Sequence, residues 1–188
     1  MAVANIQSNI IRLGTEAVLR YRTIATITSD SDLPEVFLGG FIASRLYDEI
    51  RCSVHIERPY TKMAAELGIE INQELKNKIG GQRADIAIYQ GGLPSHIVEF
   101  KIFDEGTQPT SIISDLEKAK ELANNKPISV VLGFMICQTS SKSLAERIEE
   151  LRSKLSPGLA CGEPQPSVDR KWNWCFGCSY WVKNEITN

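Results

Sequence analysis

The stretch Arg83–Phe103 reads R-A-D-I-A-I-Y-Q-G-G-L-P-S-H-I-V-E-F-K-I-F, and its pattern predicts a β-hairpin. Two runs rich in β-branched and aromatic residues flank the segment Gln90–Pro94, whose glycines and proline favour a turn. The two runs should therefore pair as adjacent antiparallel strands, and the polar residues within them are the ones that need an explanation.

Two acids and a lysine are expected to meet on this hairpin. Side chains alternate between the two faces of a strand, so Glu99 and Lys101 share one face. If Tyr89 pairs with Ser95 across the turn, the antiparallel register places Asp85 opposite Glu99 on that same face. Two carboxylates and one ammonium group would then converge among apolar neighbours.

Such a group of charges is costly to bury, because each ion removed from water loses several kcal/mol of solvation. A divalent cation between Asp85 and Glu99 would offset that cost, and hard oxygen ligands suit Mg²⁺ or Mn²⁺. Lys101 could orient or deprotonate a water, or stabilise a pentavalent phosphate. The alternative interpretation is a Glu–Lys pair and a separate aspartate on a solvated sheet face.

At these residues the chain resembles the PD-(D/E)XK nuclease superfamily, the restriction-endonuclease-like proteins. Asp85 corresponds to the isolated aspartate of the motif, and Glu99-Phe100-Lys101 corresponds to its E-x-K element. Ala84 stands where the motif often has proline. The resemblance covers roughly Pro34–Cys137. It implies an α/β fold, namely a three-layer sandwich in which helices flank a mixed central β-sheet.

The resemblance also implies an activity, a Mg²⁺- or Mn²⁺-dependent endonuclease that hydrolyses phosphodiester bonds in DNA, with RNA left open. Asp85, Glu99 and the carbonyl oxygen of Phe100 would bind the metal, and Lys101 would position the attacking water. A second hypothesis is a non-catalytic module of the same fold that binds nucleic acid or serves as an assembly subunit. A homodimer formed through the first helix or the last strand is compatible with both.

Two further acids are candidate metal ligands. Glu35 lies near the start of a helix expected to reach Ile50, and a glutamate at this place reaches the metal in many members of the superfamily. Asp32 and Glu35 also form a capping-box pattern, which explains Glu35 equally well. Glu57 ends a strand expected over Cys52–Tyr60, where it is either a third acid of the site or an ordinary surface residue.

Two basic residues are candidates for binding the phosphate of the substrate. Arg83 should share a strand face with Asp85, where it could hold a phosphate or pair with an acid. Lys62 opens a polar, helix-prone insertion at residues 61–82, and such insertions often cover a site. Solvation of a surface helix explains Lys62 as well.

The remaining chain fits one domain of 188 residues. An apolar helical stripe from Ile6 to Ile24 predicts a helical extension over residues 1–30, which Gly14 could interrupt. The second hairpin strand, the helix after it and the buried strand Ile128–Cys137 predict a parallel, right-handed crossover. Another helix, a loop over residues 158–170 and a tryptophan-rich strand over 171–183 complete the chain.

The five cysteines are expected to be reduced thiols. Cys175-x-x-Cys178 lies in a strand pattern that points its two sulfurs to opposite faces, so core packing explains the pair better than zinc. No apolar run is long enough to span a bilayer and no signal pattern opens the chain, so we expect a cytoplasmic protein. The net charge of −2 still allows a local basic patch for nucleic acid.

Overall fold

The computed structural model describes residues 3–25, 33–124, 126–155 and 158–182. Helices and strands follow one another in the predicted order, with two short strands added near the end. The elements are α1 (Val3–Ala25), α2 (Glu35–Ile50), β1 (Ser53–Pro59), α3 (Tyr60–Glu66), α4 (Gln73–Ile79), β2 (Arg83–Gln90), β3 (Leu93–Phe103), α5 (Pro109–Ala123), β4 (Ser129–Cys137), α6 (Leu144–Lys154), β5 (Ala160–Cys161), β6 (Gln165–Pro166) and β7 (Asn173–Val182).

The strands form one mixed sheet of seven strands in the order β1-β2-β3-β4-β7-β5, with β6 also paired to β7. β3 and β4 are parallel, as the helical crossover between them predicts, and the other neighbours are antiparallel. β4 lies at the centre, and its residues from Val130 to Cys137 are buried. The continuous apolar run Ile128–Cys137 thus forms a strand that is covered on both faces, as predicted.

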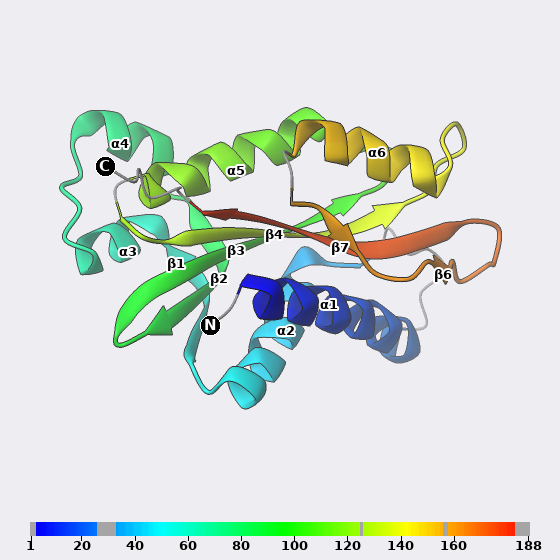
Figure 1. Ribbon diagram of the computed structural model, residues 1–188, viewed down its shortest axis with the longest axis horizontal. Coiled ribbons are helices and arrows are strands. Elements are labelled where there is room, and N and C mark those ends of the chain that lie inside the picture. The colour runs from blue at the N-terminus through cyan, green and yellow to red at the C-terminus, as the bar shows by residue number, and fades with distance from the viewer. Residues whose placement is uncertain (1–2, 26–32, 125, 156–157, 183–188) are drawn as a thin grey trace.

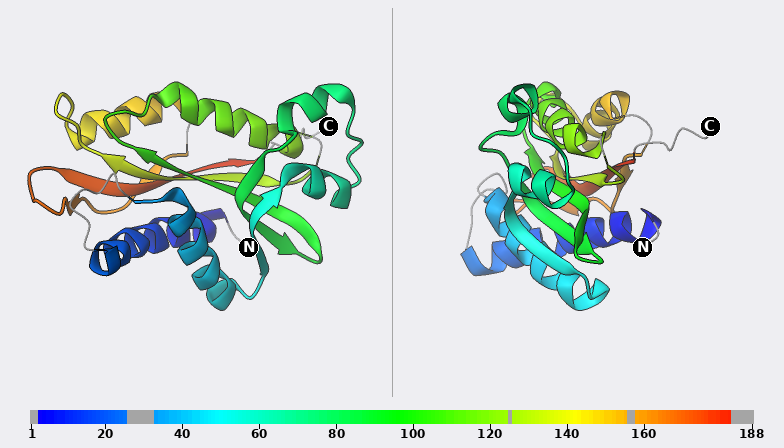
Figure 2. Two further views of the ribbon diagram at one scale, coloured as in Figure 1. Left: turned by 180° about the vertical axis from the view of Figure 1, so that it is seen from behind. Right: turned by 90° about the vertical axis from the view of Figure 1, so that its left-hand side faces the viewer.

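Helices cover both faces of the sheet (Figures 1 and 2). α1 and α2 lie on one face, whereas α5 and α6 lie on the other, where α3 and α4 extend the layer. Each face has its own apolar core, because alternate strand residues point to opposite sides. The coarse prediction of an α/β sandwich with a mixed sheet is confirmed.

α1 is part of the core and runs without interruption through Gly14. Its apolar stripe, which includes Ile6, Ile10 and Leu13, is buried against the sheet and α2. A Cβ atom at Gly14 would lie 2.3 Å from the Phe176 ring, so the missing side chain lets the helix approach β7. The predicted helix is thus continuous, because this packing outweighs the low helix propensity of glycine.

The last third of the chain needs one correction. The segment predicted as a loop contains β5 and β6, whose two-residue pairings with β7 leave no periodic pattern in the sequence. Trp174 is fully buried and Trp181 packs against the opposite core, so the tryptophans of β7 serve packing. Cys175 and Cys178 belong to different cores, as the strand pattern predicts.

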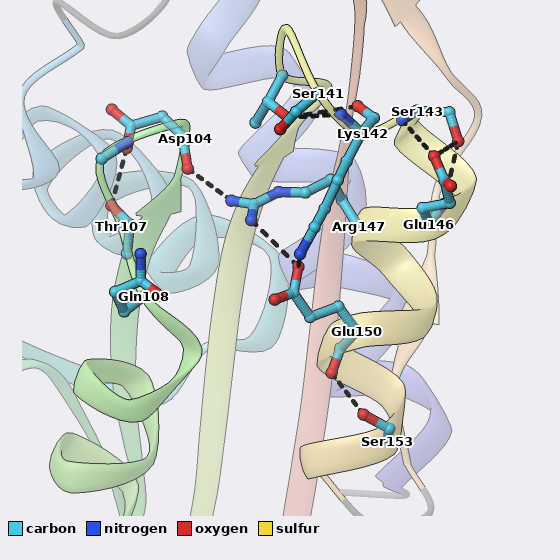
Figure 3. Close-up of polar contacts among 12 residues, drawn as sticks. Asp104, Thr107, Gln108, Ser141, Lys142, Ser143, Glu146, Arg147, Glu150 and Ser153 are labelled. Carbon is cyan, nitrogen blue, oxygen red and sulfur yellow. Dashed lines mark hydrogen bonds and ion pairs between the residues drawn. The ribbon is translucent and has the colours of Figure 1, made fainter.

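The end of β3 is tied to α6 by a buried arginine (Figure 3). One Nη atom of Arg147 donates to the carbonyl oxygen of Asp104 at 2.5 Å and the other donates to Glu150 at 3.2 Å. The guanidinium lies 3.4 Å from the centroid of the Phe103 ring. This contact fixes the turn that leaves β3 just after Lys101. None of the described helices has the length and apolar character that crossing a membrane requires.

Candidate functional site

The β2–β3 pairing brings Asp85 beside Glu99, although one predicted pair is wrong. Tyr89 pairs with Pro94 rather than Ser95, because Gly91 and Gly92 make a two-residue turn and the ladder shifts between Ile88 and Tyr89. The shift leaves Ser95 without a pairing partner on β2. The next pairs, Ile88–His96, Ala87–Ile97 and Ile86–Val98, follow the predicted register. Continuing that register places Asp85 opposite Glu99.

Beyond that pair the Asp85 carboxylate takes over the bonding to β3. Its Oδ2 atom accepts a hydrogen bond from the backbone N–H of Phe100 at 2.7 Å. A residue in an extended strand directs its N–H and C=O toward the same neighbour, so the Phe100 carbonyl faces this side as well. The Asp85 carboxylate and the Phe100 carbonyl therefore lie near one another where the β2–β3 ladder ends.

Glu99 is the buried acid of the pair, with 7% of its surface exposed. The Tyr60 hydroxyl at the start of α3 donates a hydrogen bond to its Oε1 atom, which leaves Oε2 for another partner. Burial raises the pKa of Glu99 to about 8, and the negative charge of Asp85 adds to this rise. The hydrogen bond from Tyr60 and the positive charge of Lys101 act in the opposite direction. The buried site therefore favours a proton or a cation on Glu99 at neutral pH.

The pKa of Asp85 shifts in the same direction. Burial raises it to about 6, the Phe100 N–H bond and Lys101 oppose that rise, and the charges of Glu35 and Glu57 add to it. Four acids thus act on one another within a small region of the sheet. Negative charge gathered in this way attracts a positive ion.

Lys101 bridges two acids from different helices. Its Nζ atom lies 3.2 Å from Oε2 of Glu35 and 3.3 Å from Oδ2 of Asp115 on α5. Burial alone would lower the pKa of Lys101, but the charges of Glu35 and Asp115 outweigh burial and the pKa is raised. Lys101 is therefore a charged ammonium at neutral pH, suited to orienting a ligand and stabilising negative charge rather than accepting a proton.

Glu35 points at β3 instead of capping its helix. Its Oε1 atom accepts a hydrogen bond from the backbone N–H of Ile102 at 3.3 Å, in addition to its pair with Lys101. Pro34 is the N-cap residue of α2 and makes no side-chain cap bond, and Asp32 lies outside the described residues. Glu35 therefore contacts Lys101 at the site, and its predicted capping pattern with Asp32 falls outside the described residues.

Glu57 lies opposite Asp85 on the other neighbouring strand. Ile56 and Arg58 pair with Ile86 and Ala84, whereas Glu57 between them makes no ladder pair and has a φ of 52°. This left-handed backbone is uncommon for a glutamate. Its side chain is exposed, close enough for its charge to act on Asp85.

The two predicted substrate-binding residues lie at the rim. Arg83 is exposed and its Nη1 atom donates to the backbone carbonyl of Glu57 at 3.3 Å, so it supports the unusual backbone there rather than pairing with a carboxylate. Lys62 is exposed on α3, two residues after the buried Tyr60, so the two side chains leave the helix on opposite sides.

Sequence reasoning missed Tyr60 and Asp115. Tyr60 was predicted as the last residue of a strand but begins α3, and only the fold brings its hydroxyl to Glu99. Asp115 did carry a signal, since it lies three residues after Ile112 and four before Ala119, within the apolar stripe of α5. A lone acid on a buried helix face requires a partner, and here the partners are Lys101 and Lys118.

The donor set fits a hard divalent cation that keeps part of its water shell. Among the described residues no group of three or more His, Cys, Asp or Glu side chains is arranged to hold a metal. Two carboxylates and a carbonyl suit Mg²⁺ nevertheless, because Mg²⁺ commonly binds one or two carboxylates together with waters and phosphate. Neither Asp85 nor Glu99 lines the hollows of ≈ 420, ≈ 490 and ≈ 660 Å³ on the described surface.

Comparison with protein family models, with curated proteins and with solved structures finds no match to this chain.

Proposed function

We propose that the protein is a Mg²⁺-dependent nuclease with a restriction-endonuclease-like fold, acting on phosphodiester bonds in DNA. The observation that carries the proposal is that Asp85, Glu99 and Lys101 gather where the β2–β3 ladder ends, close enough for their charges to act on one another. It is supported by the Asp85 bond to the Phe100 N–H and by the raised pKa values of both acids. Perturbed acids beside a charged lysine are typical of catalytic sites.

The chain's own groups divide the work as follows. Asp85 and Oε2 of Glu99, with the Phe100 carbonyl, would hold the cation, while Tyr60 keeps Glu99 in place. A bound divalent ion lowers the pKa of its water and stabilises charge on the phosphate. Lys101, held by Glu35 and Asp115, would orient the attacking water and stabilise the charge that develops on the phosphate oxygens.

The direct test is cleavage of supercoiled plasmid, linear duplex and single-stranded DNA in Mg²⁺ or Mn²⁺. Wild type should cleave at least one of these, and Asp85→Asn should reduce the rate by about 10³-fold, since removal of a group that stabilises transition-state charge typically costs this much. An Asp169→Asn variant, changed in a turn far along the sheet, should cleave normally. Equal activity in Asp85→Asn and wild type would remove the mechanism.

A second candidate function is a nucleic-acid-binding module with a residual acidic site. One observation favours it: both acids already have partners within the chain, Asp85 at the Phe100 N–H and Glu99 at the Tyr60 hydroxyl. Titration calorimetry with Mg²⁺ separates the two candidates. A nuclease should bind Mg²⁺, and the Asp85→Asn variant should lose this binding. A binding module need not bind Mg²⁺ at all.

Tyr60 provides a further prediction for the metal site. Tyr60→Phe removes the donor that orients Glu99, and loss of such a supporting partner typically lowers metal affinity about 10- to 100-fold. Calorimetry with Mn²⁺ measures the change. Tyr180→Phe is the matched control, because the Tyr180 hydroxyl also donates to a side chain, Ser129 Oγ at 2.8 Å, but away from the site. Equal affinities of the two variants would show that Tyr60 has only a packing role.

A further inference from the structure

A hollow of ≈ 660 Å³ lies between the end of α2, the start of β1 and the β2–β3 turn. These segments lie at the same end of the molecule (Figures 1 and 2). The hollow is close to the acids along the strands, since His55 comes two residues before Glu57 and Tyr89 comes four residues after Asp85. At about 3.3 Å per strand residue, these separations are about 7 and 13 Å.

Arg51 stands at the rim of this hollow with a strained backbone. It ends α2 with φ 54° and ψ 29°, where its N–H donates to the Tyr47 carbonyl at 3.1 Å. Glycine or asparagine usually occupies this left-handed position, so arginine there is held at a conformational cost. Its side chain is exposed and has no ion-pair or hydrogen-bond partner among the described residues.

The wall of the hollow is rigid and its charges are matched. Arg58 donates to the Tyr89 hydroxyl at 2.8 Å and pairs with Glu66, to which Tyr89 also donates at 2.5 Å. The ring of His55 lies 4.6 Å from that of Tyr89. Glu66 pairs with Arg58, so among the residues that line the hollow Arg51 supplies the excess positive charge. This contrasts with the acidic site beside it.

The turn opposite Arg51 leaves room for a ligand. Gly91 and Gly92 have φ values of 59° and 83°, and a Cβ at either position would meet no atom within 4 Å. Both are exposed. A turn without side chains lets an extended polymer pass close to the backbone while Arg51 reaches it from the other side.

We infer that this hollow is a phosphate subsite, in which Arg51 binds the backbone of the nucleic-acid strand cut at Asp85 and Glu99. The inference rests on the proposed function and adds to it a second contact on the substrate. Arg51 comes six residues before Glu57, at most about 20 Å along the strand, and one strand of a duplex rises about 3.4 Å per nucleotide, so the two contacts lie up to about six nucleotides apart. The guanidinium fork matches a phosphate, which DNA and RNA share.

The test compares Arg51→Gly with Arg170→Gly. Arg170 is also an arginine with positive φ, 58°, but it precedes β7 at the other side of the sheet. Glycine relieves the backbone at both positions, so both variants should unfold about 1–4 °C higher than wild type. Only Arg51→Gly should bind a labelled 20-base-pair DNA duplex more weakly, by roughly tenfold at 50 mM salt.

Binding is measured by fluorescence anisotropy in Ca²⁺, over a range of salt, with single- and double-stranded DNA and RNA of one sequence. Loss of one phosphate contact should reduce the salt slope by about 0.9 for duplex. Equal affinity and slope of the two glycine variants would overturn the subsite and leave the nuclease proposal standing. A wild type that binds but never cleaves in Mg²⁺ would overturn only the nuclease. A wild type that binds none of the four probes would overturn both.

Discussion

Glu99→Gln should abolish Mg²⁺-dependent cleavage and at the same time stabilise the metal-free protein at alkaline pH. The loss of a metal ligand should lower activity by about 10³-fold or more. The gain in stability follows from burial, because glutamine occupies the same space, can still accept from Tyr60 and carries no charge. A site that costs stability for the sake of function gives this opposed pair of effects.

The pH dependence of that gain has a definite sign. The pKa of Glu99 rises from its ordinary 4.5 to about 8 on folding. Its contribution to stability is fully present below pH 4.5 and is lost as the pH rises toward 8, since the unfolded state releases the proton first. Glutamine does not titrate, so the variant should match wild type near pH 4.5 and exceed it by about 3–5 kcal/mol at pH 9.

Urea denaturation in EDTA at pH 4.5, 7 and 9 measures the difference. Glu117→Gln is the control, since Glu117 is an exposed residue on α5 outside the site, and its effect should be below about 0.5 kcal/mol at every pH. A Glu99→Gln variant that is equally or less stable than wild type at pH 9 would contradict the assigned burial of the charge.

Lys101→Met should lower both activity and stability. Removing the ammonium leaves Glu35 and Asp115 without their shared partner beside Asp85 and Glu99. Breaking these partly exposed ion pairs should cost about 1–3 kcal/mol, between the values for surface and buried pairs. The loss should be greatest above pH 8, where Glu99 is ionised, and smaller near pH 5, where both hairpin acids retain protons. Cleavage should fall by about 10²- to 10³-fold.

Lys118→Met is the matched control for Lys101→Met, because Lys118 contacts the same acid, Asp115, at 2.8 Å. Only Lys101 also contacts Glu35. The control should lose less than about 1 kcal/mol and keep its cleavage rate. Equal effects of the two variants would mean that Asp115 alone, and not the site, needs the cation.

The sequence was sufficient for the strand that carries Glu99 and Lys101 and for its register with Asp85, because period-two patterning and a glycine turn are local signals. The sequence was not sufficient for the pairing of Tyr89, since no local signal shows that Ser95 is left unpaired where the register shifts. The choice between capping and site for Glu35 also needed three dimensions, as its partners lie 66 and 67 residues away.

Tyr60 and Asp115 escaped prediction for a related reason. Each reaches the site from an element separated from the hairpin by a connection whose path the sequence does not determine. The left-handed backbones of Glu57 and Arg51 were equally invisible, because neither residue type favours that conformation. The sequence therefore predicted the site residues that lie within one hairpin. It did not predict the residues that other elements bring to that hairpin.

The guanidinium of Arg147, packed on Phe103 and bonded to the carbonyl that follows it, has a consequence for slow opening of the native state. α6 and the final residues of β3 should open together as one cooperative unit, so amide protons near Lys101 gain exchange protection from a helix that never touches the substrate. Heating that loosens this helix should therefore free the end of β3 around Lys101 before the rest of the sheet melts.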